Sequence, residues 1–502
     1  MKLDRRGRPA LLCLAIAALY VASPLAATSD SGSGAPPAAA GVAAGAGTGS
    51  PVTTVPINAT TAYPLGVTTD ASGNVWFAED NLDSLAEFFP SNGTSLTFAI
   101  PTPHHLMWVW YMVFDAGGNL WFSDESQQLL WRFDPASGTF ANYTAGTAYP
   151  MVLHYDRARG RMWFTSLKTG QVGYFSLSGG KAVLGAVANL SAPIPGSGVS
   201  GIAVDTAGNV YVAESFQAKI VELAGDTLSV MRTWSLPAGS QPVGLALDPG
   251  RGRLWFTDHG SSFFGYVGLN SSAVVEFPTS LYVAGGGYSV SLPYWILVSS
   301  AGDVWFNEHF ANRIARFDPA TSQLTEFEIP TNNSSPLMLS ADDQRGEVWF
   351  TEFAGNALGV VDENSTLGAS VNTSVSRGTA GPSLSLTSTS SPVAASLPTV
   401  SATAQITGAP QPGFEVTVTP QGGGDEVSLT AYRAGPGNYT AAVCYRYEYF
   451  SQCGYLAVTV PPAASVLSLL YAVYAAVGLA VVVLALVLLR GSRKDRVRRL
   501  VP

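Results

Sequence analysis

The sequence is poor in the residues that most often carry catalysis or hold cofactors. Its 502 residues include three cysteines and five histidines, and 12% of them are charged. It contains no HExxH, no pair of CxxC motifs, no GxSxG and no glycine-rich phosphate loop. These absences leave no standard zinc-hydrolase, thiol-redox, serine-hydrolase or nucleotide site in the sequence.

Basic residues are scarce everywhere except at the two ends of the chain. Residues 1–27 and 490–502 hold ten of the 26 Lys and Arg residues but two of the 35 acids. The part between them therefore has 16 basic and 33 acidic residues, a net charge of −17. Such an acidic surface argues against nucleic acid as a partner and suits solubility or cation binding.

The two ends carry the patterns of exported, membrane-anchored proteins. Residues 1–27 combine a basic start, an apolar run and small residues, which predicts a signal peptide, with an uncleaved anchor as the alternative. Residues 466–489 contain no charge and are long enough to cross a bilayer as a helix. The basic residues 490–502 follow at once and predict a cytoplasmic C-terminus. We therefore expect a single-pass protein of the cell membrane whose bulk lies outside.

Cysteines and glycosylation motifs agree with export. Cys444 and Cys453 flank a predicted turn and favour one disulfide, although two reduced cysteines are also compatible with the spacing. Asn-x-Ser/Thr motifs are frequent and favour a heavily glycosylated surface protein. They stand at Asn58, Asn92, Asn142, Asn189, Asn270, Asn332, Asn333, Asn364, Asn372 and Asn438.

Seven repeats decide the expected fold. Each has alternating apolar residues, usually an Asp, then a Gly/Asn turn, an aromatic pair and most often an acid, as in GVTTDASGNVWFAE and GLALDPGRGRLWFTD. The first aromatic residues of the pairs are Trp76, Trp121, Trp163, Tyr211, Trp255, Trp305 and Trp349. Alternation around a tight turn predicts a hairpin, and further short strands complete four per repeat. This pattern predicts an all-β, seven-bladed β-propeller over residues 52–366, with strand 53–57 completing the last blade.

The remaining segments are expected to be accessory. Residues 28–51 are predicted to be a low-complexity linker and residues 367–398 a Ser/Thr/Pro-rich stalk. Residues 399–461 contain short strand-like runs, which predict a small immunoglobulin-like β-sandwich stapled by the disulfide. Its expected role is to hold the propeller away from the membrane.

Two loops that lead into innermost strands are rich in aromatic residues. We expect the side chains on these loops to bind an extracellular ligand, glycan or protein, since aromatic rings beside polar groups suit sugars and peptides. The alternative is that the rings pack between blades. The candidates are His104, Trp108, Trp110, Tyr111, Tyr294 and Trp295.

Acidic residues end most of the second strands, and two of them precede a histidine. A ring of carboxylates with imidazole could hold a divalent cation such as Mg²⁺ or Ca²⁺. The alternative is one polar residue per repeat at a solvent-facing strand end. The metal candidates are Glu79, Glu214, Asp258, His259, Glu308 and Glu352, and the catalytic candidates are His309, Glu308 and Glu352.

The repeats resemble those of the virginiamycin B lyase family. The likeness extends over about residues 54–362 and is most evident in VWFNEHFANRIARFDPATSQLTEFEIP and VWFTEFAGNALGV. It implies a seven-bladed propeller and, for active members, magnesium-assisted elimination that linearises streptogramin B antibiotics.

The positions that the resemblance marks as functional are replaced in this sequence. Leu65 stands for the family's tyrosine, and Tyr294 and Leu337 stand for its two histidines. Ser335 stands for one magnesium-binding glutamate, and the other aligns with Glu352 or, by strict spacing, with Phe353. Since Leu337 can neither take a proton nor bind a metal, the family's reaction is expected to be absent.

Two hypotheses for function follow. The leading one is a membrane-anchored, extracytoplasmic, non-catalytic propeller that binds a ligand or partner through its aromatic loops. The alternative is a metal-dependent enzyme, either a divergent lyase or a lactonase that resembles the gluconolactonase propellers.

Overall fold

The computed structural model describes residues 50–102, 107–190, 198–280 and 291–365, and beyond them seven strands between Asn372 and Val460. Within these ranges no helix is long and apolar enough to cross a membrane. The predicted signal peptide, the membrane span of residues 466–489, the basic tail and His104 all lie outside the described residues.

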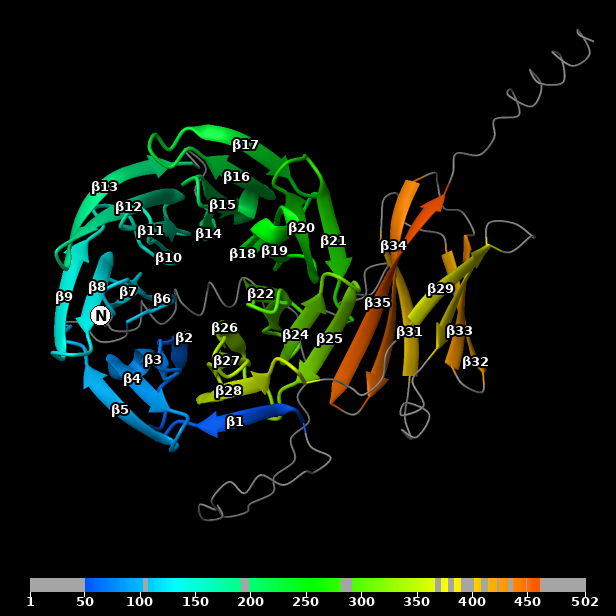
Figure 1. The fold of residues 1–502 in the computed structure, drawn as a ribbon, viewed down its shortest axis with the longest axis horizontal. Coiled ribbons are helices and arrows are strands. Elements are labelled where there is room, and N and C mark those ends of the chain that lie inside the picture. The colour runs from blue at the N-terminus through cyan, green and yellow to red at the C-terminus, as the bar shows by residue number, and fades with distance from the viewer. Residues whose placement is uncertain are drawn as a thin grey trace, which may run out of the picture. The chain divides into compact units, whose positions relative to one another are not determined.

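Seven four-stranded antiparallel blades form the ring in the described part of the chain (Figure 1). The innermost strands are β2 (Pro64–Thr69), β6 (Met112–Phe114), β10 (Leu153–Asp156), β14 (Val199–Val204), β18 (Pro242–Asp248), β22 (Pro293–Val298) and β26 (Pro336–Asp342). The second strands are β3 (Val75–Glu79), β7 (Leu120–Asp124), β11 (Arg161–Ser166), β15 (Val210–Glu214), β19 (Arg253–Asp258), β23 (Val304–Glu308) and β27 (Glu347–Glu352). The all-β, seven-bladed propeller predicted from the repeats is confirmed.

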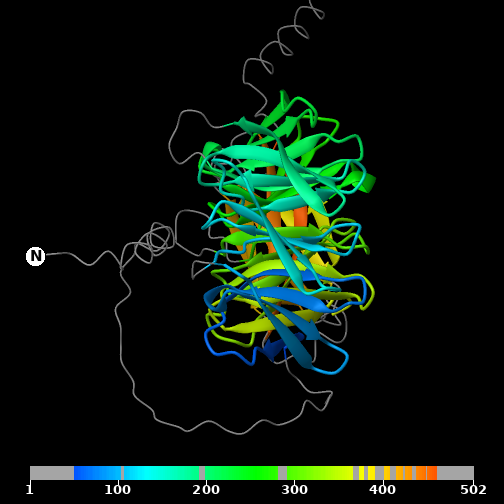
Figure 2. The same cartoon turned by 90° about the vertical axis from the view of Figure 1, so that its left-hand side faces the viewer.

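The other two strands of each blade lie toward the rim, which Figure 2 views from outside. The third strands are β4 (Ser84–Phe89), β8 (Leu129–Asp134), β12 (Gln171–Ser178), β16 (Lys219–Leu223), β20 (Phe263–Gly268), β24 (Arg313–Asp318) and β28 (Ala357–Asp362). The outer strands are β5 (Thr94–Ala99), β9 (Thr139–Thr144), β13 (Lys181–Asn189), β17 (Val230–Ser235), β21 (Val274–Pro278), β25 (Gln323–Glu328) and β1 (Val52–Pro56). Short 3-10 helices are η2 (Asp80–Leu82), η3 (Ser215–Gln217) and η4 (Pro249–Arg251).

The first strand of the chain closes the ring, as the sequence predicted. β1 pairs antiparallel with β28, from Val52 opposite Val361 to Pro56 opposite Ala357. The seventh blade therefore combines residues from both ends of the propeller, which ties the first blade to the last.

The repeated Asp and Trp form one hydrogen-bonded unit in the first, second and fifth blades. In the second blade, Asp115 accepts hydrogen bonds from the backbone N–H groups of Gly117 (2.8 Å) and Asn119 (3.0 Å). It also accepts one from the indole Nε1–H of Trp121 (2.8 Å), whose side chain is fully buried. The Asp thus shapes the hairpin turn and satisfies a buried indole at the same time.

Side chains near the ends of second strands hold neighbouring blades together. Thr257 Oγ1 donates to the carbonyl of Tyr294 (2.6 Å), and Thr351 Oγ1 donates to that of Leu65 (3.0 Å). Asn307 Nδ2 donates to the carbonyl of Pro336 in the same way (2.8 Å). Each bond joins one blade to the innermost strand of the next. They position the loops at this end of the channel.

Seven further strands follow the propeller and form a four-stranded sheet, β29-β30-β33-β32, and a second run, β31-β34-β35. They are β29 (Asn372–Arg377), β30 (Ser383–Thr389), β31 (Ser401–Thr407), β32 (Phe414–Gln421), β33 (Gly424–Ala431), β34 (Gly437–Tyr447) and β35 (Phe450–Val460). Two of them fall in the segment predicted as a stalk, where Leu384 and Leu386 alternate with polar residues. The β-sandwich itself stays a prediction.

Cys444 and Cys453 lie opposite one another on β34 and β35. Their sulfur atoms are 1.97 Å apart, and both residues are buried. This is the pairing that the sequence favoured over two reduced cysteines. That the two cysteines are oxidised in the protein stays a prediction for experiment.

Candidate functional site

A continuous series of aromatic rings crosses one face of the propeller. The topology brings the loops before innermost strands and after second strands to this face. Successive ring centroids lie 5.4 to 6.2 Å apart along Tyr63, Phe353, Trp108, Trp110 and Tyr294. Tyr294 then contacts both His259 (5.6 Å) and His309 (5.8 Å). We call these seven side chains the aromatic face.

The loop before β6 reaches across the channel mouth. Trp110 belongs to the second blade, yet its ring contacts Tyr294 of the sixth. Beneath it, Tyr111 contacts the buried ring of Trp295 at 5.2 Å, and burial raises the pKa of Tyr111 to about 12. Aromatic side chains therefore connect the second blade with the sixth.

Two acids of the first blade hold this loop in place. The carboxylate of Asp80 accepts a hydrogen bond from the backbone N–H of Val109 (3.2 Å), and that of Asp83 accepts one from Met107 (3.3 Å). Burial holds the pKa of Asp80 well above its usual range, although the bond from Val109 opposes this rise. The loop is therefore fixed to the blade by hydrogen bonds at two of its backbone amides.

The structure separates the five described aromatic-loop candidates by depth. Trp108, Trp110 and Tyr294 are half-buried on the aromatic face, whereas Trp295 is buried in the core. Tyr111 packs against Trp295, as expected from the alternative interpretation, in which the rings pack between blades. Packing between blades therefore describes Tyr111 and Trp295, and ligand binding by Trp108, Trp110 and Tyr294 stays a prediction.

His259 and His309 form a stacked pair of neutral imidazoles. Their ring centroids lie 5.0 Å apart and the rings are parallel within 4°. Burial lowers the pKa of His259 to about 3, with a contribution from His309, and burial lowers that of His309 to about 4. His309 Nδ1 lies 3.1 Å from the carbonyl of Leu292, a contact that requires Nδ1 to carry the proton. Nε2 of His309 is then the hydrogen-bond acceptor.

Glu125 adds an acid to the loop before β6. Its Oε2 accepts a hydrogen bond from Trp110 Nε1 (2.8 Å), and its backbone N–H donates to the carbonyl of Trp108 (3.2 Å). Burial raises the pKa of Glu125, while the bond from Trp110 lowers it. Glu125 therefore orients an indole of the aromatic face.

The acids that end the second strands are buried, so the interpretation as solvent-facing strand ends is wrong. Glu79, Asp124, Glu214, Asp258, Glu308 and Glu352 are each at most 3% exposed. Strand alternation turns these side chains into the blade, where most of them hold local structure. Asp258, for example, accepts from the backbone N–H groups of Gln241 (2.7 Å) and Gly260 (3.0 Å), and burial raises its pKa.

The metal candidates do not converge in the described residues, among which no three His, Cys, Asp or Glu side chains form a group that could hold a metal ion. Glu214 instead pairs with Lys219 (3.2 Å), and Glu79 accepts from Ser84 Oγ (2.7 Å). Glu352 accepts from Thr54 Oγ1 (2.8 Å) on the closing strand. The residues present thus do not fit a magnesium or calcium ion.

The residue that follows each of these acids in the sequence identifies the aromatic face better than the acid does. Since alternate residues of a strand point in opposite directions, the next position along points toward the channel mouth. That position holds His259, His309 and Phe353 in the last three blades. Of these, the sequence analysis proposed the two histidines for catalysis or metal binding and had no binding role for Phe353.

Comparison with known proteins agrees with this architecture. The Virginiamycin B lyase family matches residues 50–337, which is more than half of the 502-residue chain. The chain belongs to the virginiamycin B lyase family. No curated protein matches it.

Two solved structures of the virginiamycin B lyase family have the same fold. A streptogramin B lyase is 20% identical, with a TM-score of 0.53, and the match covers 62% of this chain and 96% of the other. A virginiamycin B lyase from Staphylococcus aureus is 19% identical, with a TM-score of 0.52 and coverage of 62% and 98%. At this identity the likeness shows the fold alone.

The virginiamycin B lyase resemblance marks several positions as functional. In this structure some of them lie away from the aromatic face and others on it. Leu65 is fully buried, and Leu337 is half-buried. Tyr294 lies on the aromatic face. Phe353 also lies on this face, whereas Glu352 points to Thr54.

Proposed function

We propose that this protein is an extracytoplasmic ligand-binding or protein-interaction module that uses the aromatic face and does not catalyse the family's elimination. The observation that carries the proposal is the unbroken series of rings from Tyr63 to the histidine pair. Half-buried rings offer apolar area without much loss of side-chain freedom, which favours binding of sugar rings or peptide side chains.

The polar groups of the face favour an uncharged ligand. Both imidazoles are neutral at pH 7, since their pKa values lie at about 3 and 4. Burial raises the pKa of Glu125, whose carboxyl oxygen is already engaged by Trp110. Hydrogen bonds from the neutral imidazoles, combined with ring stacking, suit sugar hydroxyls and peptide amides.

The proposal extends to how the module is displayed. A cleaved signal peptide, N-glycosylation at the ten sequons, a disulfide-stapled sandwich and the apolar segment of residues 466–489 would together place the propeller outside a membrane. Extraction of membranes at alkaline pH tests the anchor: the full chain is expected in the pellet and a chain ending at residue 461 in the supernatant. Recovery of the full chain in the supernatant would contradict the anchor.

A binding screen tests the aromatic face. Glycans and peptides are applied to the wild-type protein and to the Trp110→Ala and Tyr294→Ala variants. We expect each variant to lose about 5- to 150-fold in affinity for the ligands found, because each removes a stacking surface worth about 1–3 kcal/mol. Leu96→Ala is the matched control, since Leu96 is 53% exposed on the rim strand β5. Equal affinities for all four proteins would refute the proposed face.

A second candidate function is a divergent lyase or a lactonase. The observation in its favour is His309, a neutral imidazole whose Nδ1 is held by Leu292 and which lies beside Tyr294. Incubation with a streptogramin B antibiotic or simple lactones, with and without Mg²⁺, would reveal ring opening by mass spectrometry. Ring opening that His309→Gln abolishes would replace the binding proposal with the enzymatic one.

A further inference from the structure

The outer strand of the sixth blade differs from the outer strands of other blades. In β25, Leu324, Thr325, Glu326 and Phe327 are all buried, whereas most of β5 and β17 is exposed. The cause is β35, which pairs antiparallel with β25 from Leu324 opposite Cys453 to Phe327 opposite Phe450. The C-terminal strand thus adds a fifth strand to this blade.

Apolar side chains continue the core of the blade into the added strand. Phe450 contacts Phe327 with ring centroids 5.4 Å apart, and Tyr455 contacts Phe277 at 5.2 Å. Tyr455 also donates its hydroxyl to the carbonyl of Pro278 (2.6 Å). Packed rings of this kind are typical of a specific interface, because they lose water from both sides.

A buried ion pair lies at the centre of this contact. Glu326 has no exposed surface and accepts hydrogen bonds from the Ser451 hydroxyl of β35 and from the backbone N–H of Ser280 (2.8 Å). Arg313, 4% exposed, pairs with Glu326 (3.3 Å) and with Glu328 (3.2 Å). A buried carboxylate is stable only with such partners, and Ser451 is the one that the C-terminal strand supplies.

We propose that the outer edge of the sixth blade is a strand-accepting site for this chain's own strand Phe450–Gly454. The Glu326–Ser451 hydrogen bond makes this pairing specific. The occupied edge joins β35 to the sixth blade. This joint does not depend on the proposed ligand or on the absence of catalysis.

Hydrogen exchange of the full chain, purified in detergent, tests the joint. In wild-type protein the amides of β25 are expected to exchange as slowly as those of the interior strand β27. Ser451→Asp adds a carboxylate beside Glu326, which already interacts with Glu308, and is expected to accelerate exchange in β25 at least tenfold, without effect on β27. Adding Glu326→Gln removes the repulsion and is expected to restore protection.

Ser95→Asp on β5 is the matched control, because Ser95 is exposed on an outer strand that lacks a fifth partner in the described residues. It is expected to leave exchange in β25 unchanged. Should Ser451→Asp disturb the whole fold, Phe450→Ala, which keeps every polar partner, is expected to accelerate β25 alone.

Three outcomes would overturn the joint. Unprotected β25 amides in wild-type protein would mean that the edge is open in solution. Equal exchange in wild type, Ser451→Asp and Phe450→Ala would mean that β35 does not cover it. Protection that grows with protein concentration, together with a dimer mass by light scattering, would assign the strand to a second copy.

Discussion

At the scale of single residues, this propeller contains shielded titratable groups that make its stability depend on pH in opposite directions. His259 and His309 have pKa values lowered by burial to about 3 and about 4. Glu276 on β21 has a pKa raised to about 8, by burial first and by the charge of Asp258 second. Each group binds protons differently in the folded and unfolded chain, so each makes stability depend on pH.

The histidine pair makes the protein less stable in acid. An unfolded chain takes up protons on histidine below a pKa of about 6.5, whereas the folded chain does not until about pH 4. The free energy of unfolding is therefore expected to fall as pH decreases from 6.5 toward 4. His309→Gln should flatten this slope, as measured by denaturant unfolding at several pH values. Parallel slopes for the two proteins would contradict the buried neutral imidazole.

Glu276 acts in the opposite direction. The folded protein keeps its proton up to a pKa of about 8, while the unfolded chain loses it at about 4.5. Stability is therefore expected to decline as pH rises from 4.5 to 8, by up to about 1.4 kcal/mol per pH unit. The unfolding free energy of Glu276→Gln should rise relative to that of the wild type as pH increases over this range. A difference in unfolding free energy that does not change with pH would contradict the assignment.

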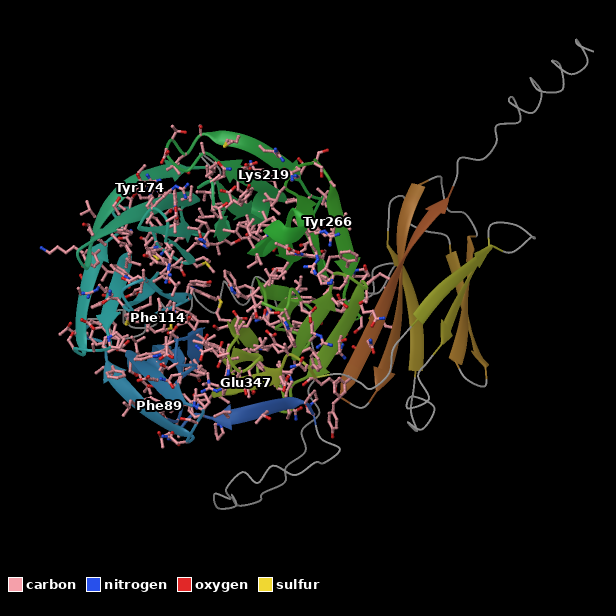
Figure 3. All side chains as sticks on the ribbon, viewed as in Figure 1. Phe89, Phe114, Tyr174, Lys219, Tyr266 and Glu347 are labelled. Carbon is pink, nitrogen blue, oxygen red and sulfur yellow. A yellow bond between two sulfur atoms is a disulfide. The ribbon has the colours of Figure 1, made fainter. Side chains whose placement is uncertain are left out.

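At the scale of elements, the Asp–turn–Trp unit stabilises the first, second and fifth blades, and other contacts take its place in the rest. Figure 3 shows how densely side chains fill the blades. In the third and fifth blades, Arg161 and Arg253 lie over the rings of Tyr174 (4.4 Å) and Tyr266 (4.3 Å), both labelled there. Where Ser299 replaces the Asp in the sixth blade, Trp305 Nε1 has no hydrogen-bond partner among the described residues. The unit is thus reinforced differently from blade to blade.

Removal of one such Asp is expected to be costly. Asp115→Ala leaves the buried indole of Trp121 and two turn amides without their acceptor, and should lower the unfolding free energy by about 2–3 kcal/mol. Asp115→Asn keeps an acceptor oxygen and should lose less than about half of that. Denaturant unfolding measures both variants. Equal losses would mean that the charge, and not the hydrogen-bond geometry, carries the stabilisation.

Sequence periodicity predicted these elements well and the candidate site less well. Strand alternation and the Asp–turn–Trp spacing are local, so the repeats predicted seven blades and even the closing strand. Trp110 and Tyr294 were found because aromatic residues are conspicuous in polar loops. Their contact across the channel, between the second and sixth blades, depends on ring closure, which no local pattern contains.

The main error in the prediction from sequence was the direction in which the side chains at the strand ends point. An acid after the aromatic pair was taken as a group facing solvent or a metal, and it is buried in the blade instead. Extending the alternation by one residue would have placed Phe353 at the channel mouth. The role of Ser451 against Glu326 could not be anticipated, because its partner is 125 residues away in the sequence.

At the scale of the whole molecule, the closing strand links the stability of every blade. Val52 on β1 is 3% exposed and belongs to the large apolar core that also contains Val361. Val52→Asp puts a charge into this core and is expected to lower the unfolding free energy by about 3 kcal/mol. Thr53→Asp, on the exposed side of the same strand, is the control and should change it by less than about 0.5 kcal/mol. Similar losses for both would argue that β1 does not close the ring in solution.

The molecule as a whole has three features: a ring that β1 closes, the aromatic face, and an outer edge of the sixth blade that the C-terminal strand covers. The central functional claim is that ligands bind at the aromatic face. The most direct measurement is a crystal structure of the propeller with the tightest ligand from the glycan and peptide screen. The account predicts ligand atoms in van der Waals contact with Trp110 and Tyr294 and within hydrogen-bond distance of His309. A ligand seated elsewhere on the ring, with the aromatic face bare, would contradict it.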